Sequence, residues 1–145
     1  MTARRQVAAL PLRHTKNGAI EILLVTSLDT GRWIIPKGWP SKRLGDSKAA
    51  AREARQEAGV KGKIARKALG TYRYVKPEIG DGCPIDVAVF LLAVWKQCKR
   101  WPEKRLRQRA WFDVLEAAGK ITEPELSLLI GSLQSLSKHH TIRTF

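Results

Sequence analysis

Cysteine is scarce in this sequence of 145 residues, which contains only Cys83 and Cys98 and no Cys-x-x-Cys pair. Two isolated thiols cannot form a disulfide framework, and without paired cysteines the usual zinc and thiol-redox motifs are excluded. We expect both thiols to be ordinary side chains of a protein in a reducing compartment.

Long hydrophobic runs are missing as well. The longest apolar run, residues 85–95, contains Asp86 and reaches only about half of the roughly 20 residues that a membrane helix needs. The apolar segment at residues 7–12 is too short for a secretory leader. Both absences predict a soluble, cytoplasmic protein with no membrane partner.

Acidic residues are few, because 13 Asp and Glu oppose 27 Lys and Arg and leave a formal net charge of +14. Such an excess predicts an anionic partner, which is a nucleic acid, an acidic membrane surface or a phosphate-rich small molecule. The length fits a single domain over residues 1–145, and a hydrophobic content of 43% is enough for one core.

Short apolar segments separated by turn residues predict a series of strands. Asn17-Gly18 is a hairpin signal between the segments at 6–12 and 19–26. A helix is predicted over 48–58, with Asp46-Ser47 as its cap and Gly59 as its stop. Further predicted elements are strands at 32–35, 63–65, 70–75, 85–97 and 110–112, loops at 77–84 and 98–109, a helical turn at 114–118 and a helix at 123–137. This pattern indicates an α/β (α+β) protein with a mixed sheet packed between helices.

The predicted central helix carries the most informative residues. Glu53, Gln56 and Glu57 share one face at helical spacing, where the two carboxylates repel each other. Glu57 also meets the negative end of the helix dipole. A divalent cation on this face removes both penalties, and oxygen ligands suit Mg²⁺. The alternative is a solvated helix whose glutamates pair with basic neighbours such as Arg52 and Arg55.

The segment from Gly38 to Val60 resembles the signature of the Nudix hydrolase family, G-x5-E-x7-R-E-U-x-E-E-x-G-U, in which U is aliphatic. Seven positions fall in register: Gly38, Arg52, Glu53, Ala54, Glu57, Gly59 and Val60. The lead-in at residues 33–38 also resembles the strand that precedes this box, and the order of elements fits over the whole chain. The Pro-Lys-Gly-Trp-Pro variant at residues 36–40 is similar to a bacterial subgroup akin to diphosphoinositol polyphosphate phosphohydrolases and diadenosine polyphosphate hydrolases.

Two positions depart from this signature. Leu44 replaces the first glutamate of the box, at a position peripheral to the metal in the family, so we expect the loss to be tolerated. Gln56 replaces a glutamate that is usually a metal ligand. An amide oxygen can still ligate a hard cation, but it carries no charge. We therefore expect weaker Mg²⁺ binding and reduced turnover.

The resemblance implies an α/β/α sandwich and Mg²⁺-dependent hydrolysis of a diphosphate linkage, with Mn²⁺ as a substitute metal. The implied metal ligands are the Gly38 carbonyl oxygen and the side chains of Glu53, Gln56 and Glu57. The implied catalytic residues also include Arg52, which would orient a box glutamate. The general base would be a box glutamate or an acid on a distant loop, for which Glu103 is the candidate. The alternative for Glu103 is a surface residue that neutralises Lys104 or Arg107.

Basic residues gather in two stretches, at residues 61–76 and 96–109. Guanidinium and ammonium groups suit several phosphates at once, which favours a polyphosphorylated substrate such as a dinucleoside or diphosphoinositol polyphosphate. The expected phosphate-binding residues are Lys37, Lys104, Arg105, Arg107 and Arg109. A solvated basic surface is the alternative.

The sequence thus favours a Mg²⁺-dependent pyrophosphohydrolase acting on an anionic phosphorylated small molecule. A catalytically impaired Nudix domain that binds a phosphorylated ligand or RNA ranks second, because Gln56 removes an anionic ligand. A general nucleic-acid binder, which would rest on charge alone, ranks third.

Overall fold

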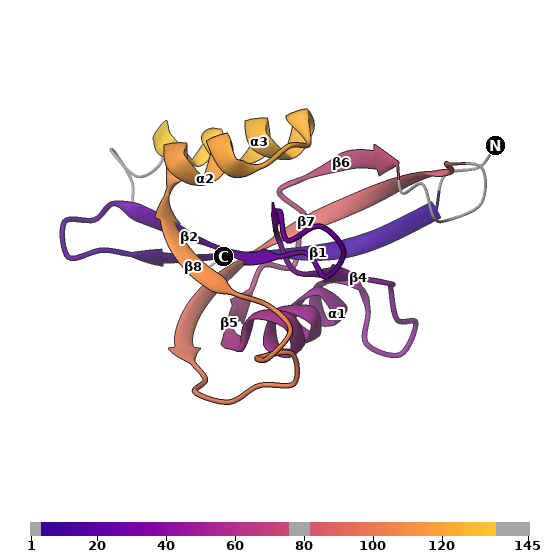
Figure 1. Ribbon diagram of the computed structural model, residues 1–145, viewed down its shortest axis with the longest axis horizontal. Coiled ribbons are helices and arrows are strands. Elements are labelled where there is room, and N and C mark those ends of the chain that lie inside the picture. The colour runs from indigo at the N-terminus through magenta and orange to yellow at the C-terminus, as the bar shows by residue number, and fades with distance from the viewer. Residues whose placement is uncertain (1–3, 76–81, 136–145) are drawn as a thin grey trace.

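The computed structural model describes residues 4–75 and 82–135, which form a mixed sheet with helices on both faces (Figure 1). The strands are β1 (Arg4–His14), β2 (Ile20–Thr26), β3 (Trp33–Ile34), β4 (Lys37–Gly38), β5 (Val60–Ile64), β6 (Gly70–Val75), β7 (Pro84–Gln97) and β8 (Arg109–Asp113). The helices are α1 (Asp46–Glu53), which continues as a π-helical turn η1 (Ala54–Ala58), α2 (Val114–Lys120) and α3 (Pro124–Gly131). The predicted class and the predicted mixed sheet between helices are confirmed.

The sheet is built around β1 and β7, which run parallel from Arg4 opposite Ile85 to Leu12 opposite Ala93. Its main order is β3-β2-β1-β7-β5, while β4 pairs with β1, β6 with β7 and β8 with β2. The long strand β7 pairs antiparallel with β6 along its first half and with β5 along its second half. The near-continuous apolar run in β7 follows from this position, because a central strand is covered on both faces.

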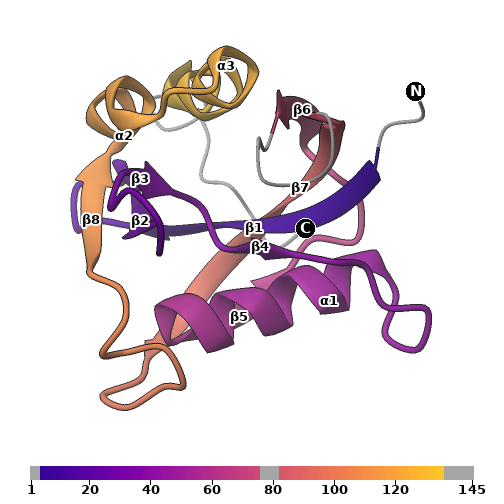
Figure 2. The same cartoon turned by 45° about the vertical axis from the view of Figure 1, so that its right-hand side comes forward.

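Two hydrophobic clusters lie on opposite faces of the sheet, as Figure 2 shows by the positions of α1 and of the α2–α3 pair. On one face, α2 and α3 bury Val114, Leu126 and Ile130 against the sheet. On the other face, α1 and η1 pack through alanines at positions 49, 50, 54 and 58. Small side chains on this face let the helix backbone lie close to the strands, above all to the central strand β1. Within the described residues, no helix is long and apolar enough to span a membrane.

Several predicted boundaries need correction. The N-cap of α1 is Gly45 at φ 83° with no side-chain capping bond, and Asp46 is instead the first helical residue, paired with Arg5 at 2.6 Å. The helix predicted over 123–137 is interrupted at Ser132: α3 ends at Gly131, residues 133–135 are helical again, and residues 136 and 137 lie outside the described part. The loop predicted at 77–84 also falls mostly outside it, although Pro84 already begins β7.

Candidate active site

The carboxyl groups of Glu53 and Glu57, one at the end of α1 and the other in η1, lie close enough to change each other's pKa. Glu57 is only 6% exposed, and its carboxyl also accepts a hydrogen bond of 3.3 Å from the backbone N–H of Lys37. Gly59 then ends the helical segment in the left-handed conformation, at φ 67°, as the sequence predicts. The predicted carboxyl pair is therefore present, with Glu57 buried and Glu53 half-buried.

Gly38 can lie against this pair because it has no side chain. A Cβ at this position would come within 2.6 and 2.7 Å of the two carboxylate oxygens of Glu53. The Glu53 carboxyl thus occupies the space that any other residue at position 38 would fill. This contact gives a physical reason for a glycine there, and it brings the Gly38 backbone into the predicted ligand set.

The protonation of the pair is strongly perturbed. The pKa of Glu57 is raised to about 8: burial is the largest cause, the Arg107 guanidinium opposes the rise, and the neighbouring Glu53 and Glu103 carboxylates add to it. Burial is also the main cause that raises the pKa of Glu53. A carboxyl with a raised pKa keeps its proton at neutral pH, and a bound cation can displace that proton.

Gln56 and Glu103 form a second pair at the same end of the helix. The Gln56 Nε2 donates to a Glu103 carboxylate oxygen at 3.2 Å, and the backbone N–H of Glu103 donates to the Gln56 carbonyl at 3.1 Å. Arg107 Nε donates to the other Glu103 oxygen at 2.6 Å, and another Arg107 nitrogen lies 3.9 Å from a Glu57 oxygen. Glu103 therefore neutralises Arg107. The Glu103 side chain is only 17% exposed, however, so it lies beside the signature residues and not on the open surface.

The donor set at this site is made of oxygen atoms only. No group of three or more His, Cys, Asp or Glu side chains able to hold a metal occurs in the described ranges 4–75 and 82–135. The remaining predicted ligands are neutral, namely the Gly38 carbonyl and the exposed Gln56 amide. Arg52 is exposed and close enough to lower the pKa of Glu53, but within residues 4–75 no hydrogen bond joins it to a box glutamate.

The loop at residues 98–109 is fastened to the helix end by Trp101 and Arg109. Trp101 Nε1 donates to the Glu57 carbonyl at 3.1 Å, and its ring lies where a Cβ of Gly59 would be. Arg109 donates to the carbonyls of Ala58 at 2.9 Å, Gly59 at 3.2 Å and Cys98 at 2.9 Å, and it stacks on Trp101. These bonds satisfy carbonyl groups that a helix end leaves without partners.

A cavity of about 530 Å³ opens beside Glu57. It is lined by Gln6, Ser27, Leu28, Asp29, Thr30, Arg32, Ile34, Lys37, Glu57, Tyr74, Val75 and Arg107. Sequence reasoning missed Gln6 and Arg32 here, because nothing local distinguishes them and only the sheet brings β1, β6 and the segment before β3 together. Tyr74 Oη donates to Gln6 Oε1 at 2.8 Å, and Lys37 lies over the Tyr74 ring.

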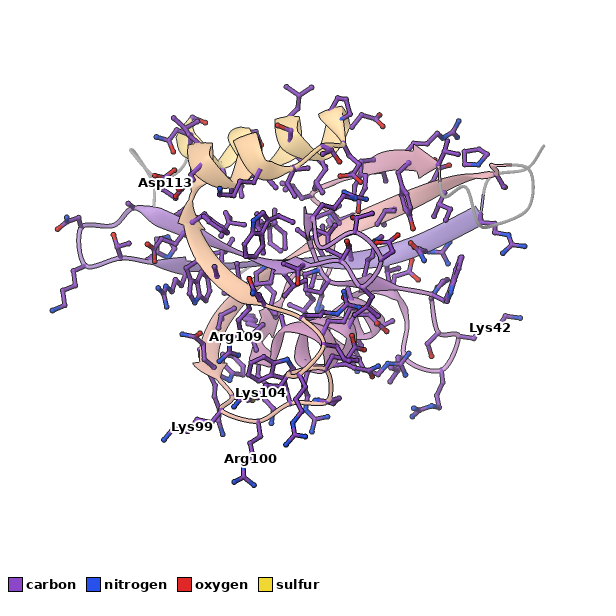
Figure 3. The ribbon with its side chains drawn as sticks, viewed as in Figure 1. Lys42, Lys99, Arg100, Lys104, Arg109 and Asp113 are labelled. Atoms are coloured by element: carbon purple, nitrogen blue, oxygen red, sulfur yellow. The ribbon has the colours of Figure 1, made fainter. Side chains whose placement is uncertain are left out.

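Of the five predicted phosphate-binding residues, only Lys37 and Arg107 line this cavity. Arg109 instead donates to three backbone carbonyls, as described above, and does not line this cavity. Lys104, which donates to the Lys99 carbonyl at 2.6 Å, and Arg105 line an adjoining hollow that shares Arg107 with this cavity. Figure 3 shows Lys99, Arg100 and Lys104 at the outer end of the loop.

Comparison with known proteins agrees with this geometry. The model of the NUDIX domain matches residues 2–129. Nudix hydrolase 21, chloroplastic, from Arabidopsis thaliana is 35% identical over 120 residues, which cover 79% of this chain and 58% of that protein. Diphosphoinositol polyphosphate phosphohydrolase 3-alpha from Mus musculus is 32% identical over 117 residues, covering 79% and 66%.

Solved structures support the fold. A binary complex of C. elegans Ap4A hydrolase superposes with a TM-score of 0.70 at 19% sequence identity, over 92% of this chain and 97% of that one. The chain spans little more than half the length of the Arabidopsis relative. With the box in register, the carboxyl pair in place and the family model matched over most of its length, the chain belongs to the NUDIX domain family.

Proposed function

We propose that this protein is a Mg²⁺-dependent hydrolase that cleaves a diphosphate linkage in a phosphorylated small molecule. The observation that carries the proposal is the Glu53–Glu57 pair, in which Glu53 lies against the Gly38 backbone and the buried Glu57 lines a cavity. Membership of the NUDIX domain family supports the reaction class.

The residues fit a hard divalent cation. Two neighbouring carboxyls with raised pKa values offer anionic oxygens once a cation displaces their protons, and the Gly38 carbonyl and the Gln56 amide add neutral oxygens. Mg²⁺ suits such a set, and Mn²⁺ is a suitable substitute. A metal held there would neutralise phosphate charge and lower the pKa of a water molecule.

The chain's own side chains supply the rest of the site. Lys37 and Arg107 place positive charge on the cavity wall, where they can hold substrate phosphates. Glu103 is the candidate general base, because Gln56 and Arg107 fix its two oxygens beside the box. Arg107 also contacts Glu57 and thus orients both carboxyl groups relative to the bound phosphates.

The cavity favours a substrate with a nucleoside end. Tyr74, Leu28 and Val75 give its wall aromatic and apolar surface that suits a base. Its cations are few, and Arg32 is already paired with Glu123 at 2.8 Å. A densely phosphorylated inositol would need more cations than this wall offers. We therefore place a dinucleoside polyphosphate ahead of a diphosphoinositol polyphosphate.

The second candidate function is a binding module with little turnover. It is favoured by Gln56, which is uncharged, and by the Arg107 guanidinium 3.9 Å from Glu57, which competes with a metal for the same carboxyl. Such a protein would bind the phosphorylated ligand without hydrolysing it.

The test is product release from diadenosine polyphosphates, diphosphoinositol polyphosphates, nucleoside triphosphates and ADP-ribose, with Mg²⁺ and with EDTA. We expect turnover that requires Mg²⁺, is lost in Glu57→Gln and persists in Glu116→Gln, an exposed carboxylate on α2. Turnover that survives EDTA or Glu57→Gln would contradict the proposal. Ligand binding without any turnover would support the binding module.

A further inference from the structure

Most of the surplus positive charge lies outside the candidate active site. A second hollow, of about 620 Å³, is lined by Lys63, Ala65, Arg66, Lys67, Leu69 and Leu91. Its cations, Lys63, Arg66 and Lys67, are exposed, while Ala65 and Leu91 belong to the buried core. The hollow thus has a basic rim and an apolar floor, and it shares no residue with the cavity beside Glu57.

The rim and the active-site helix face opposite sides of the sheet. Val60 and Ile64 of β5 pack into the hydrophobic cluster of α1. Because side chains alternate along a strand, Lys61 and Lys63 lie on the other face. Ala65 and Leu91 confirm this, since both belong to the cluster under α2 and α3. A ligand in this hollow would therefore not be a substrate of the box.

The positive charges on β5 and the end of β7 repel one another. Lys61 stands directly opposite Lys96 in the β5–β7 pairing, and like charges in such a pair destabilise a sheet. None of the ion pairs within residues 4–75 and 82–135 includes Lys61, Lys63 or Lys96. The same holds for Arg66 and Lys67. A polyanion would relieve this repulsion.

An exposed aromatic ring adjoins these lysines. The register of β5 against β7 shifts between Lys61 and Gly62, which leaves Trp95 as the unpaired residue of a bulge. Trp95 is 73% exposed, although a tryptophan side chain normally buries most of its surface. An indole in water beside ammonium groups is the arrangement on which unpaired nucleobases stack.

We infer that the β5 surface, formed by Lys61, Lys63, Arg66, Lys67, Trp95 and Lys96, binds single-stranded nucleic acid. The lysines and Arg66 would hold consecutive phosphates, and Trp95 would stack on a base that a duplex would hide. Lys99 and Arg100 continue the positive charge past the end of β7. An acidic membrane is the weaker fit, because Trp95 is the only large apolar side chain exposed on this surface.

The experiment measures fluorescence anisotropy of a labelled single-stranded oligonucleotide of about a dozen nucleotides with the intact protein in EDTA, which suppresses metal-dependent hydrolysis. We expect Trp95→Ala to weaken binding roughly tenfold or more and Trp95→Phe to weaken it much less, because a phenyl ring still stacks. The double variant Lys61→Gln/Lys63→Gln should lower the slope of log affinity against log salt by about 0.7 for each lysine.

Two matched controls separate this surface from bulk charge and from the active site. Lys42→Gln removes one positive charge far from the β5 surface (Figure 3), and Glu57→Gln alters the box. Both should leave affinity within about twofold of the wild type, since neither residue contacts the bound strand.

Equal weakening by Lys42→Gln, or wild-type affinity in Trp95→Ala and the double lysine variant, would overturn the inference. The lysines would then serve only to keep the edge strand β5 from pairing with other chains. Trp95-dependent binding to phosphatidylserine vesicles without binding to the oligonucleotide would overturn it too, in favour of a membrane surface.

Discussion

The buried Glu57 carboxyl makes the stability of the metal-free protein depend on pH in a defined direction. Its pKa is raised by burial from 4.5 to about 8, so between these values the native protein holds a proton that the unfolded chain has released. The free energy of unfolding therefore falls as pH rises from about 4.5 to about 8, and the titration of Glu57 lowers it no further at higher pH. At 1.36 kcal/mol for each pH unit, the full loss is at most about 5 kcal/mol.

Glu57→Gln removes this titration while nearly preserving the size of the side chain. At pH 5 we expect the wild type and the variant to have similar free energies of unfolding, because both side chains are neutral there. At pH 8.5 the variant should be more stable by several kcal/mol, since it has no carboxylate to bury. Urea unfolding in EDTA at a series of pH values measures the free energy of unfolding of both proteins.

Mg²⁺ should act with the opposite pH dependence. A cation that displaces the Glu57 proton stabilises the wild type more at pH 8.5 than at pH 5 and leaves Glu57→Gln nearly unchanged. A stability difference between the two proteins that does not vary with pH would refute the reasoning from burial, whether or not Mg²⁺ binds.

Three further changes test other contacts. Gly38→Ala drives a Cβ into the Glu53 carboxyl, so Mg²⁺-dependent turnover should fall at least tenfold in steady-state assays, whereas Gly119→Ala, where nothing lies within 4 Å, should leave it intact. Trp101→Phe removes the indole donor to the helix-end carbonyl and should lower the free energy of unfolding by about 1 kcal/mol in urea titrations; no change would mean that water replaces the bond. Gln56→Glu adds a carboxylate to the box and should lower the Mg²⁺ concentration for half-maximal turnover, and an increase would show that repulsion from its acidic neighbours dominates.

The helix formed by α1 and η1 shows which features of the site can be predicted from the sequence alone. Glu53 and Glu57 were predicted to share a face from spacing, and Gly59 to end the helix, because both features depend on local geometry. The π-helical turn at residues 54–58 was missed, since an i+4 spacing fits an α-helix equally well. Gln56, which lies in that turn, is exposed and donates from its Nε2 to Glu103.

The loop at residues 98–109 shows where local reasoning fails. Its arginines look alike in sequence, but in the folded protein Arg107 pairs with two carboxyl groups and Arg109 donates hydrogen bonds to three backbone carbonyls. Trp101 carries no local signal of its bond to Glu57, which is made across 44 positions of the chain. Roles of this kind follow from the folded arrangement of a loop against a helix end.

The basic charge is the clearest revision of the expectations from sequence. A net charge of +14 suggested a heavily phosphorylated substrate, yet few cations line the cavity beside Glu57. Lys63, Arg66 and Lys67 instead surround a hollow on the other side of the sheet. The composition indicates an anionic partner, whereas only the fold indicates which surface would bind it.

Direct metal binding tests the central claim that the Glu53–Glu57 pair forms a cation site. Titration of Mn²⁺ into the purified protein, followed by the loss of the free-ion electron paramagnetic resonance signal, counts bound metal without relying on a substrate. We predict binding that strengthens as pH rises toward 8, is lost in Glu57→Gln and is retained in Glu116→Gln. Equal binding by the wild type and Glu57→Gln would contradict the account.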